Sequence, residues 1–123
     1  MKLIAIILLS TSLLGCAANT SNNTDIQTKM SRLDKEVKSL INSAACTSDN
    51  QCHSIGFGDK PCGGFMSYRI YSDLNTDVAL LKNKVSQYNK LSKQWNRENN
   101  RVSTCDMLMP PQLSCRNQIC QKK

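Results

Sequence analysis

The sequence predicts an α+β fold, namely a small disulfide-rich domain with two amphipathic helices and short hairpins. Two stretches repeat apolar residues at helical spacing, and two others combine β-favouring residues with turn formers. Six cysteines accompany these elements, three early and three late in the chain. A length of 123 residues suits one domain with a modest core.

The N-terminus has the layout of a secretory signal. Lys2 precedes an apolar run at 3–9, and the small residue Gly15 stands just before Cys16. This order is typical of a cleaved signal peptide. The alternative is a permanent anchor helix, but the apolar run is shorter than the roughly 20 residues that a spanning helix needs. We therefore predict a signal peptide over residues 1–15.

The residues Leu13-Leu14-Gly15-Cys16 resemble the lipobox of bacterial lipoproteins, although Leu14 is bulkier than the residue usual there. The resemblance implies cleavage before Cys16, a diacylglycerol on its thiol and a further acyl chain such as palmitate on its amine. Two or more acyl chains hold a protein at a membrane firmly, whereas one does so only marginally. Ala17, in place of aspartate, implies the outer membrane if the source is Gram-negative. The expected location is the cell envelope.

The lipidated Cys16 begins a small, polar stretch that predicts a flexible tether over 16–24, followed by a disulfide-bonded domain over 25–123. The first helix is expected over residues 25–45, with Thr24 and Gln27 forming a capping box. Packing on the rest of the domain and self-association as a coiled coil are alternative uses of its apolar face. That face consists of Ile26, Met30, Leu33, Val37, Leu40, Ile41 and Ala44.

A hairpin is expected after the first helix. Residues 53–57 alternate polar and apolar side chains, and residues 65–71 are rich in β-favouring types. The run between them, 58–64, is dense in turn formers. The alternative for residues 65–71 is the start of a helix.

A second helix is expected from about residue 75 or 76 to Glu98, with Asp77 in its first turn and Asn99 as its stop. A tight hairpin is expected around residues 116–117. The apolar face of the second helix consists of Val78, Leu81, Val85, Tyr88, Leu91 and Trp95.

Seven cysteines become six once Cys16 is assigned to the lipid, and an even number in an exported chain implies a disulfide framework. Three cysteines in one group cannot all pair among themselves, so at least one bridge joins the early group to the late one. Such a bridge contributes about 2–4 kcal/mol. The sequence leaves the pairing open. The six are Cys46, Cys52, Cys62, Cys105, Cys115 and Cys120.

The chain is basic, with a formal net charge of +7 that falls to +6 when Lys2 leaves with the signal peptide. A basic surface favours acidic partners such as lipid headgroups, lipopolysaccharide phosphates or acidic envelope proteins. Nucleic acid is not expected because the chain is exported. The alternative is a basic surface that serves solubility and has no dedicated ligand.

The catalytic inventory is poor, so we expect no enzyme, no cofactor and no metal. His53 is the single histidine and follows Cys52, where a disulfide is expected. Glu36 and Glu98 fall on the two predicted helices, and nothing pairs them as acid and base. Zinc is a weak alternative because no Cys-x-x-Cys pair exists.

Two short runs are candidate contact surfaces. Glycines after Cys62 let the backbone approach a partner or present amides to an anion, and they equally suit a disulfide-pinned turn. Met107 and Met109 are typical of core-filling residues; copper(I) binding and adaptable protein contact are the alternatives. The binding residues expected at the first run are Lys60, Pro61, Gly63 and Gly64.

The spacing of Cys46 and Cys52, the run Pro61-Cys62-Gly63-Gly64, an aromatic segment with a helix, and paired late cysteines loosely resemble uncharacterised six-cysteine bacterial lipoproteins. That resemblance implies no established activity. The expected function is a lipid-anchored binding or interaction protein of the cell envelope. The alternative is an inhibitor of an extracellular or periplasmic hydrolase, because a braced loop loses little entropy on binding.

Overall fold

The computed structural model describes residues 18–123, so the predicted signal peptide and the predicted lipidation site, Cys16, lie outside the described residues. Two helices and two antiparallel hairpins confirm the α+β class. In the described part of the chain, no helix is both long and apolar enough to cross a membrane. The elements are α1 (Ala18–Ile41), the 3-10 turn η1 (Asp49–Gln51), β1 (Cys52–Asp59), β2 (Phe65–Ser72), α2 (Val78–Glu98), β3 (Leu113–Arg116) and β4 (Ile119–Lys122).

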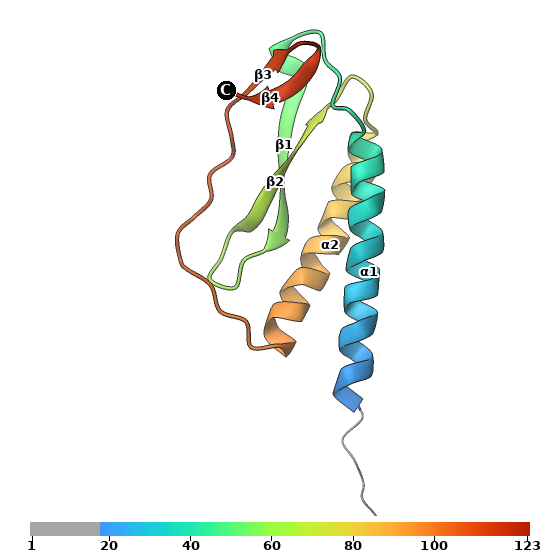
Figure 1. Ribbon diagram of the computed structural model, residues 1–123, viewed down its shortest axis with the longest axis vertical. Helices are drawn as coiled ribbons and strands as arrows, with labels where there is room; N and C mark the ends of the chain where they lie inside the picture. Colours follow the sequence, from blue (N-terminus) through green and yellow to red (C-terminus); the bar gives the residue numbers. More distant parts are fainter. Residues whose placement is uncertain (1–17) are drawn as a thin grey trace, which may run out of the picture.

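The helices and the longer hairpin form two layers (Figure 1). α1 and α2 run antiparallel and lie beside the β1–β2 hairpin, whose register extends from Cys52 opposite Ser72 to Asp59 opposite Phe65. The β3–β4 hairpin covers one end of this arrangement, and an extended segment, 99–112, leads to it along the outside. The buried core between the layers consists of Val37, Phe57, Tyr71, Leu81 and Val85.

The first helix begins earlier than the sequence predicted. α1 includes residues 18–24, and the Thr24 carbonyl accepts a hydrogen bond from Thr28 Oγ1 at 2.8 Å. This stretch contains neither glycine nor proline, and the Asn23 side chain bonds that of Asn99 at the end of α2, at 3.4 Å. The predictions of a flexible tether up to residue 24 and of a Thr24–Gln27 capping box are therefore wrong.

The same helix ends before the predicted Ala45. Asn42 and Ala44 have φ angles of 50° and 52°, which stop the helix after Ile41. The chain then pairs with the C-terminal hairpin, because the Ala44 carbonyl accepts the Cys120 amide at 3.0 Å. The end of α1 is thus tied to β4.

α2 and both hairpins agree closely with the prediction. Asp77 is the N-cap of α2 and accepts the Leu80 amide at 3.0 Å, and Asn99 is its C-cap. The β1–β2 turn lies in the expected run, and the β3–β4 turn contains Asn117 and Gln118. The apolar faces of both helices point into the domain. Their buried members are Ile26, Leu33, Val37, Leu81 and Val85, and Ala44 is buried just after the end of α1.

All three disulfides join the early group of cysteines to the late one. Two of them fasten the β3–β4 hairpin to the end of α1 and the start of β1, and the third fastens the β1–β2 turn to the segment 99–112. Each closes a loop long enough to remove about 4 kcal/mol of unfolded-chain entropy, considered singly. The pairs are Cys46–Cys115, Cys52–Cys120 and Cys62–Cys105.

We expect the three bridges to differ in their sensitivity to reductant. Cys62 and Cys105 are exposed, whereas Cys46 and Cys120 are 2% and 5% exposed. Because an attacking thiolate must reach the disulfide sulfur, low concentrations of dithiothreitol will open Cys62–Cys105 first. Iodoacetamide labelling followed by peptide mass spectrometry measures the order. Earlier labelling of Cys46 or Cys120 would contradict it.

Candidate functional site

The free edge of β1 is covered by side chains of α2. Three polar residues of the helix, at positions i, i+3 and i+7, bond the strand's backbone. Asn89 accepts the Gly58 amide at 2.7 Å and donates to the Gly56 carbonyl at 3.1 Å. Ser92 accepts the Asp59 amide at 2.9 Å, and Asn96 donates to the Asp59 carbonyl at 2.6 Å. We call these residues the amide stripe: Asn89, Ser92 and Asn96.

Removing the first of these contacts should destabilise the domain. Asn89→Ala leaves the buried amide of Gly58 and the buried carbonyl of Gly56 without their partner, which costs about 1–3 kcal/mol. Denaturant unfolding monitored by circular dichroism measures the loss. Asn83→Ala is the matched control, since Asn83 is exposed on the same helix and bonds only Gln87 in the described structure. Equal losses in the two variants would refute the role of the amide stripe.

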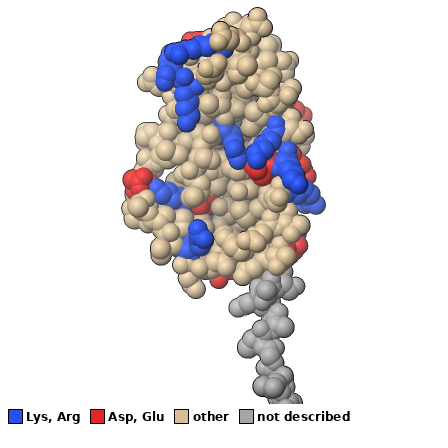
Figure 2. Space-filling view, viewed as in Figure 1, with Lys and Arg blue, Asp and Glu red and all other residues tan. Residues whose placement is uncertain are grey.

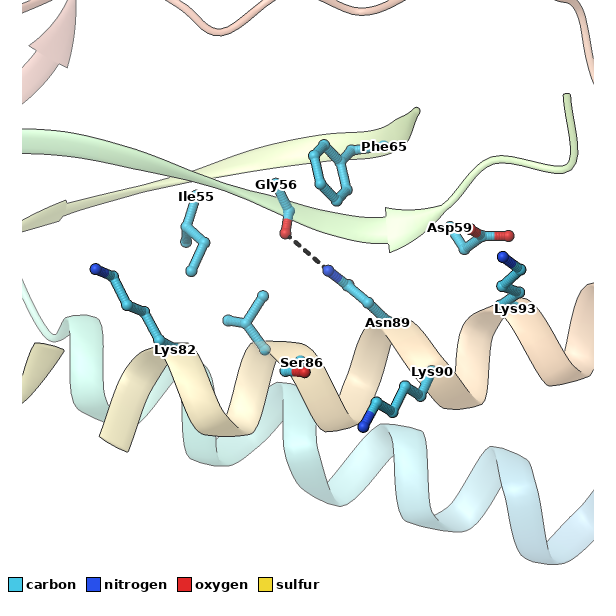
Figure 3. Close-up of a pocket in the computed structure, with 10 residues that line it drawn as sticks. Ile55, Gly56, Asp59, Phe65, Lys82, Ser86, Asn89, Lys90 and Lys93 are labelled. Atoms are coloured by element: carbon cyan, nitrogen blue, oxygen red, sulfur yellow. Dashed lines mark hydrogen bonds between the residues drawn. The ribbon is translucent and has the colours of Figure 1, made fainter. Parts of the chain in front are cut away.

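An open groove of about 520 Å³ lies between β1 and α2 (Figure 3). Ile55 points from β1 toward α2, and the ring of Phe65 lies beside Gly56. Lys82 and Lys93 extend from α2 toward the two ends of the groove, and Lys90 lies on the outer side of the helix. We call this site the basic groove. Its apolar lining is Ile55, Gly56, Phe65 and Val85, and its lysines are Lys82, Lys90 and Lys93.

Gly56 allows the aromatic wall of the groove to form. A Cβ atom on this residue would lie 2.1 Å from the Phe65 ring, far inside van der Waals contact. The Gly56 carbonyl is held at the same time by Asn89 of the amide stripe. The Phe65 ring and Asn89 of α2 therefore both approach β1 at Gly56, which has no side chain.

A side chain at residue 56 should force the ring away. We expect Gly56→Ala to cost about 1–3 kcal/mol by overpacking, measured by denaturant unfolding. In a Phe65→Ala background the same change should cost almost nothing, because the colliding ring is gone. An undiminished cost in that background would mean that the ring does not set the constraint.

In the described part of the chain, the groove lysines differ from several other lysines of the domain in their lack of ion pairs. Among the described residues, none of Lys82, Lys90 and Lys93 forms an ion pair, and all three are exposed. Lys84, on the same helix, behaves differently: its Nζ lies 2.6 Å from Glu36 Oε2 of α1 and holds the pKa of that carboxyl below its usual value. The one carboxylate lining the groove is that of Asp59. Its Oδ2 accepts a hydrogen bond from Asn96 of the amide stripe at 3.2 Å.

The groove lysines belong to a longer row of cations on α2 and just beyond its C-terminal end. Sequence reasoning missed this row because it looked for consecutive charges. These residues are instead separated by intervals of three, four or eight positions, which place side chains near one another along a helix. In the face shown in Figure 2, by contrast, the Lys and Arg side chains at the edge formed by α1 lie among acidic side chains. We call the row the basic stripe; its members, none of them ion-paired within the described structure, are Lys82, Lys90, Lys93, Arg97 and Arg101.

The predicted binding loop is only partly available at the surface. The Lys60 side chain is 12% exposed, and its Nζ lies 3.2 Å from Asp106 Oδ1. Hydrogen bonds from Thr104 and Lys60 lower the pKa of Asp106. Lys60 is thus committed to a contact within the domain. The other predicted residues of this loop are exposed: Pro61, Gly63 and Gly64.

The predicted catalytic and metal candidates have structural partners. His53 Nε2 lies 2.9 Å from Asp73 Oδ2, and within the described residues no hydroxyl or thiol is hydrogen-bonded to His53. The sulfurs of Cys46, Cys52 and Cys120 lie within 4.8 Å of one another. All three are in disulfides, so they are not the thiolates that hold zinc.

One interpretation of the sequence expected the methionines of the segment 99–112 to fill the core, and this is wrong. Met107 and Met109 are each 72% exposed. The Cys62–Cys105 bridge and a hydrogen bond of 3.3 Å from the Tyr68 hydroxyl to the Leu108 carbonyl hold this segment against the hairpin. Its extended course leaves the thioethers outside.

Comparison of the chain with protein families, curated proteins and solved structures found no match. The candidate functional residues are therefore those that the geometry distinguishes: the basic groove, the basic stripe and the exposed turn at residues 61–64.

Proposed function

We propose that this chain is a lipid-anchored binding protein of the bacterial cell envelope and that the basic groove holds an acidic partner. The signal peptide and lipobox support the location, through lipidation of Cys16. The observation that carries the binding role is that the groove is lined by three lysines without an ion pair among the described residues, together with an apolar floor formed by Ile55 and Phe65. No catalytic role is proposed.

The anchor and the domain are close in sequence. α1 begins at Ala18, two residues after Cys16, and has 24 residues, which corresponds to about 36 Å of helix. The β3–β4 hairpin lies at the opposite end of the molecule from the start of α1 (Figure 1). Lipidation would therefore hold the domain near the membrane, with its disulfide-braced end reaching farthest from the anchor.

The chemistry of the groove favours an acidic partner over a neutral one. Exposed lysines attract anions over several ångströms, but each exposed pair contributes little and is screened by salt. The apolar floor formed by Ile55 and Phe65 adds contact area that salt does not weaken. A partner with both anionic and apolar groups therefore gains from both parts of the site. Nucleic acid is not proposed as a partner, because the predicted signal peptide directs the chain out of the cytoplasm.

The exposed turn gives a second candidate, an inhibitor of an extracellular or periplasmic hydrolase. Pro61, Gly63 and Gly64 protrude at a turn that the Cys62–Cys105 disulfide braces. Lys60 would not be the inserting residue, because its side chain is paired with Asp106. The basic groove has the stronger support, since its charges have no partner within the described domain.

Photocrosslinking in living cells tests the proposal. We expect the lipidated protein, carrying a photocrosslinking amino acid in place of Ser86 in the groove, to form one dominant adduct with an envelope component. The adduct should weaken in the variant K82Q/K90Q/K93Q. An alkyne analogue of palmitate should label the protein, and Cys16→Ser should abolish the labelling. Blotting and mass spectrometry measure both.

The matched control is K35Q/K122Q/K123Q, which removes the same charge at exposed lysines outside the groove and without ion pairs in the described structure. It should retain the adduct. A crosslinker at Ser39, exposed on α1, should give no such product. Adducts that form equally from both positions, or lipid labelling that survives Cys16→Ser, would contradict the proposal. A hydrolase captured from Pro61 and not from Ser86 would favour the inhibitor.

A further inference from the structure

We infer that the basic groove binds an acidic amphipathic helix belonging to a partner protein. This inference rests on the proposed function and specifies its ligand. Three features of the described residues support it: the spacing of the lysines, the open shape of the groove, and the occupied backbone edge of β1. Together they specify the charge, the form and the binding mode of the partner.

The lysine spacing matches charges on a helix. Lys82 and Lys93 lie eleven residues apart on α2, about 16 Å along the helix axis. Eleven residues are close to three helical turns, so two carboxylates eleven residues apart on a partner helix share one face at the same separation. Apolar residues between them on that face would meet the floor at Ile55 and Phe65. The two carboxylates of the partner helix would thus lie opposite Lys82 and Lys93, one at each end of the contact.

The open shape disfavours a lone acyl chain. Small-molecule sites enclose most of their ligand's surface, whereas this groove is open to solvent along one side. An acyl chain lying in it would keep much of its apolar surface in water. A partner helix covers its own apolar face when that face is laid in the groove, and the rest of its surface remains hydrated.

The edge of β1 disfavours an added peptide strand. Strand addition needs free amides and carbonyls along a sheet edge. At Gly56, Gly58 and Asp59 these groups are already bonded by the amide stripe. The partner therefore engages side chains, which is the mode of a helix in a groove.

Binding of a synthetic peptide to the mature lipoprotein in phosphatidylcholine nanodiscs tests the inference. The probe is a fluorescent amphipathic helix with leucines on one face and two glutamates eleven residues apart on the same face. Fluorescence anisotropy should give an affinity about tenfold weaker for K82Q/K90Q/K93Q than for wild type. Replacing the two glutamates by glutamine should weaken wild-type binding similarly. The three lysines are exposed and unpaired within the described structure, so the variant should fold normally by circular dichroism.

The charge-matched variant K35Q/K122Q/K123Q should bind the probe within about twofold of wild type, because salt-screened charges outside the groove contribute little. Equal affinity of wild type and K82Q/K90Q/K93Q, equal weakening by the control variant, or no binding of the probe overturns the inference. So does lysine-dependent capture of phosphatidylglycerol vesicles without peptide binding, which would make the ligand a lipid surface. If the Ser86 adduct forms in cells while the peptide fails to bind, only this inference fails and the proposed function remains.

Discussion

The amide stripe of α2 on the edge of β1 is the contact on which the rest of the arrangement depends. A two-stranded sheet has two open edges, and buried backbone groups there must find partners. Asn89, Ser92 and Asn96 supply those partners from a helix, in the position of a third strand. Because the bonds fix the rotation of α2 about its own axis, they also decide which residues face the core and which face solvent.

Three faces of α2 follow from that rotation. Leu81 and Val85 enter the core, where Tyr88 stacks on the Phe57 ring at 3.9 Å between centroids. The guanidinium carbon of Arg69, on β2, lies 4.4 Å from the centroid of the Phe57 ring, and Arg69 also forms an ion pair with Asp34 of α1 at 2.7 Å. The hairpin is thereby held to both helices. The remaining face carries the basic stripe, and its alignment with Ile55 and Gly56 creates the groove.

Periodicity predicted most of the fold, because helices and hairpins that bury one face leave that period in the sequence. The start of α1 was missed because composition alone does not reveal that Asn23 meets Asn99, a contact between residues 76 positions apart. The pairing of cysteines was open for the same reason. The basic groove was also missed. Its lysines are not consecutive in the sequence, and they form a site only because the helix that carries them lies beside β1. Lys60 was overrated because its partner, Asp106, is equally remote in sequence.

The distribution of ion pairs separates structural charges from those available to a partner. On α1, two lysines are matched by carboxylates one turn away, in the pairs Lys29–Asp25 and Lys38–Asp34, both within 2.7 Å. Such pairs stabilise a helix by a few tenths of a kcal/mol. The basic stripe has no carboxylate partner in the described structure, and neighbouring cations on one helical face oppose folding slightly. Within the described structure these lysines and arginines thus form no ion pair that would stabilise the domain. The proposal of an acidic partner therefore rests on where these unpaired cations lie, beside the apolar side chains of Ile55 and Phe65, and not on the lack of ion pairs alone.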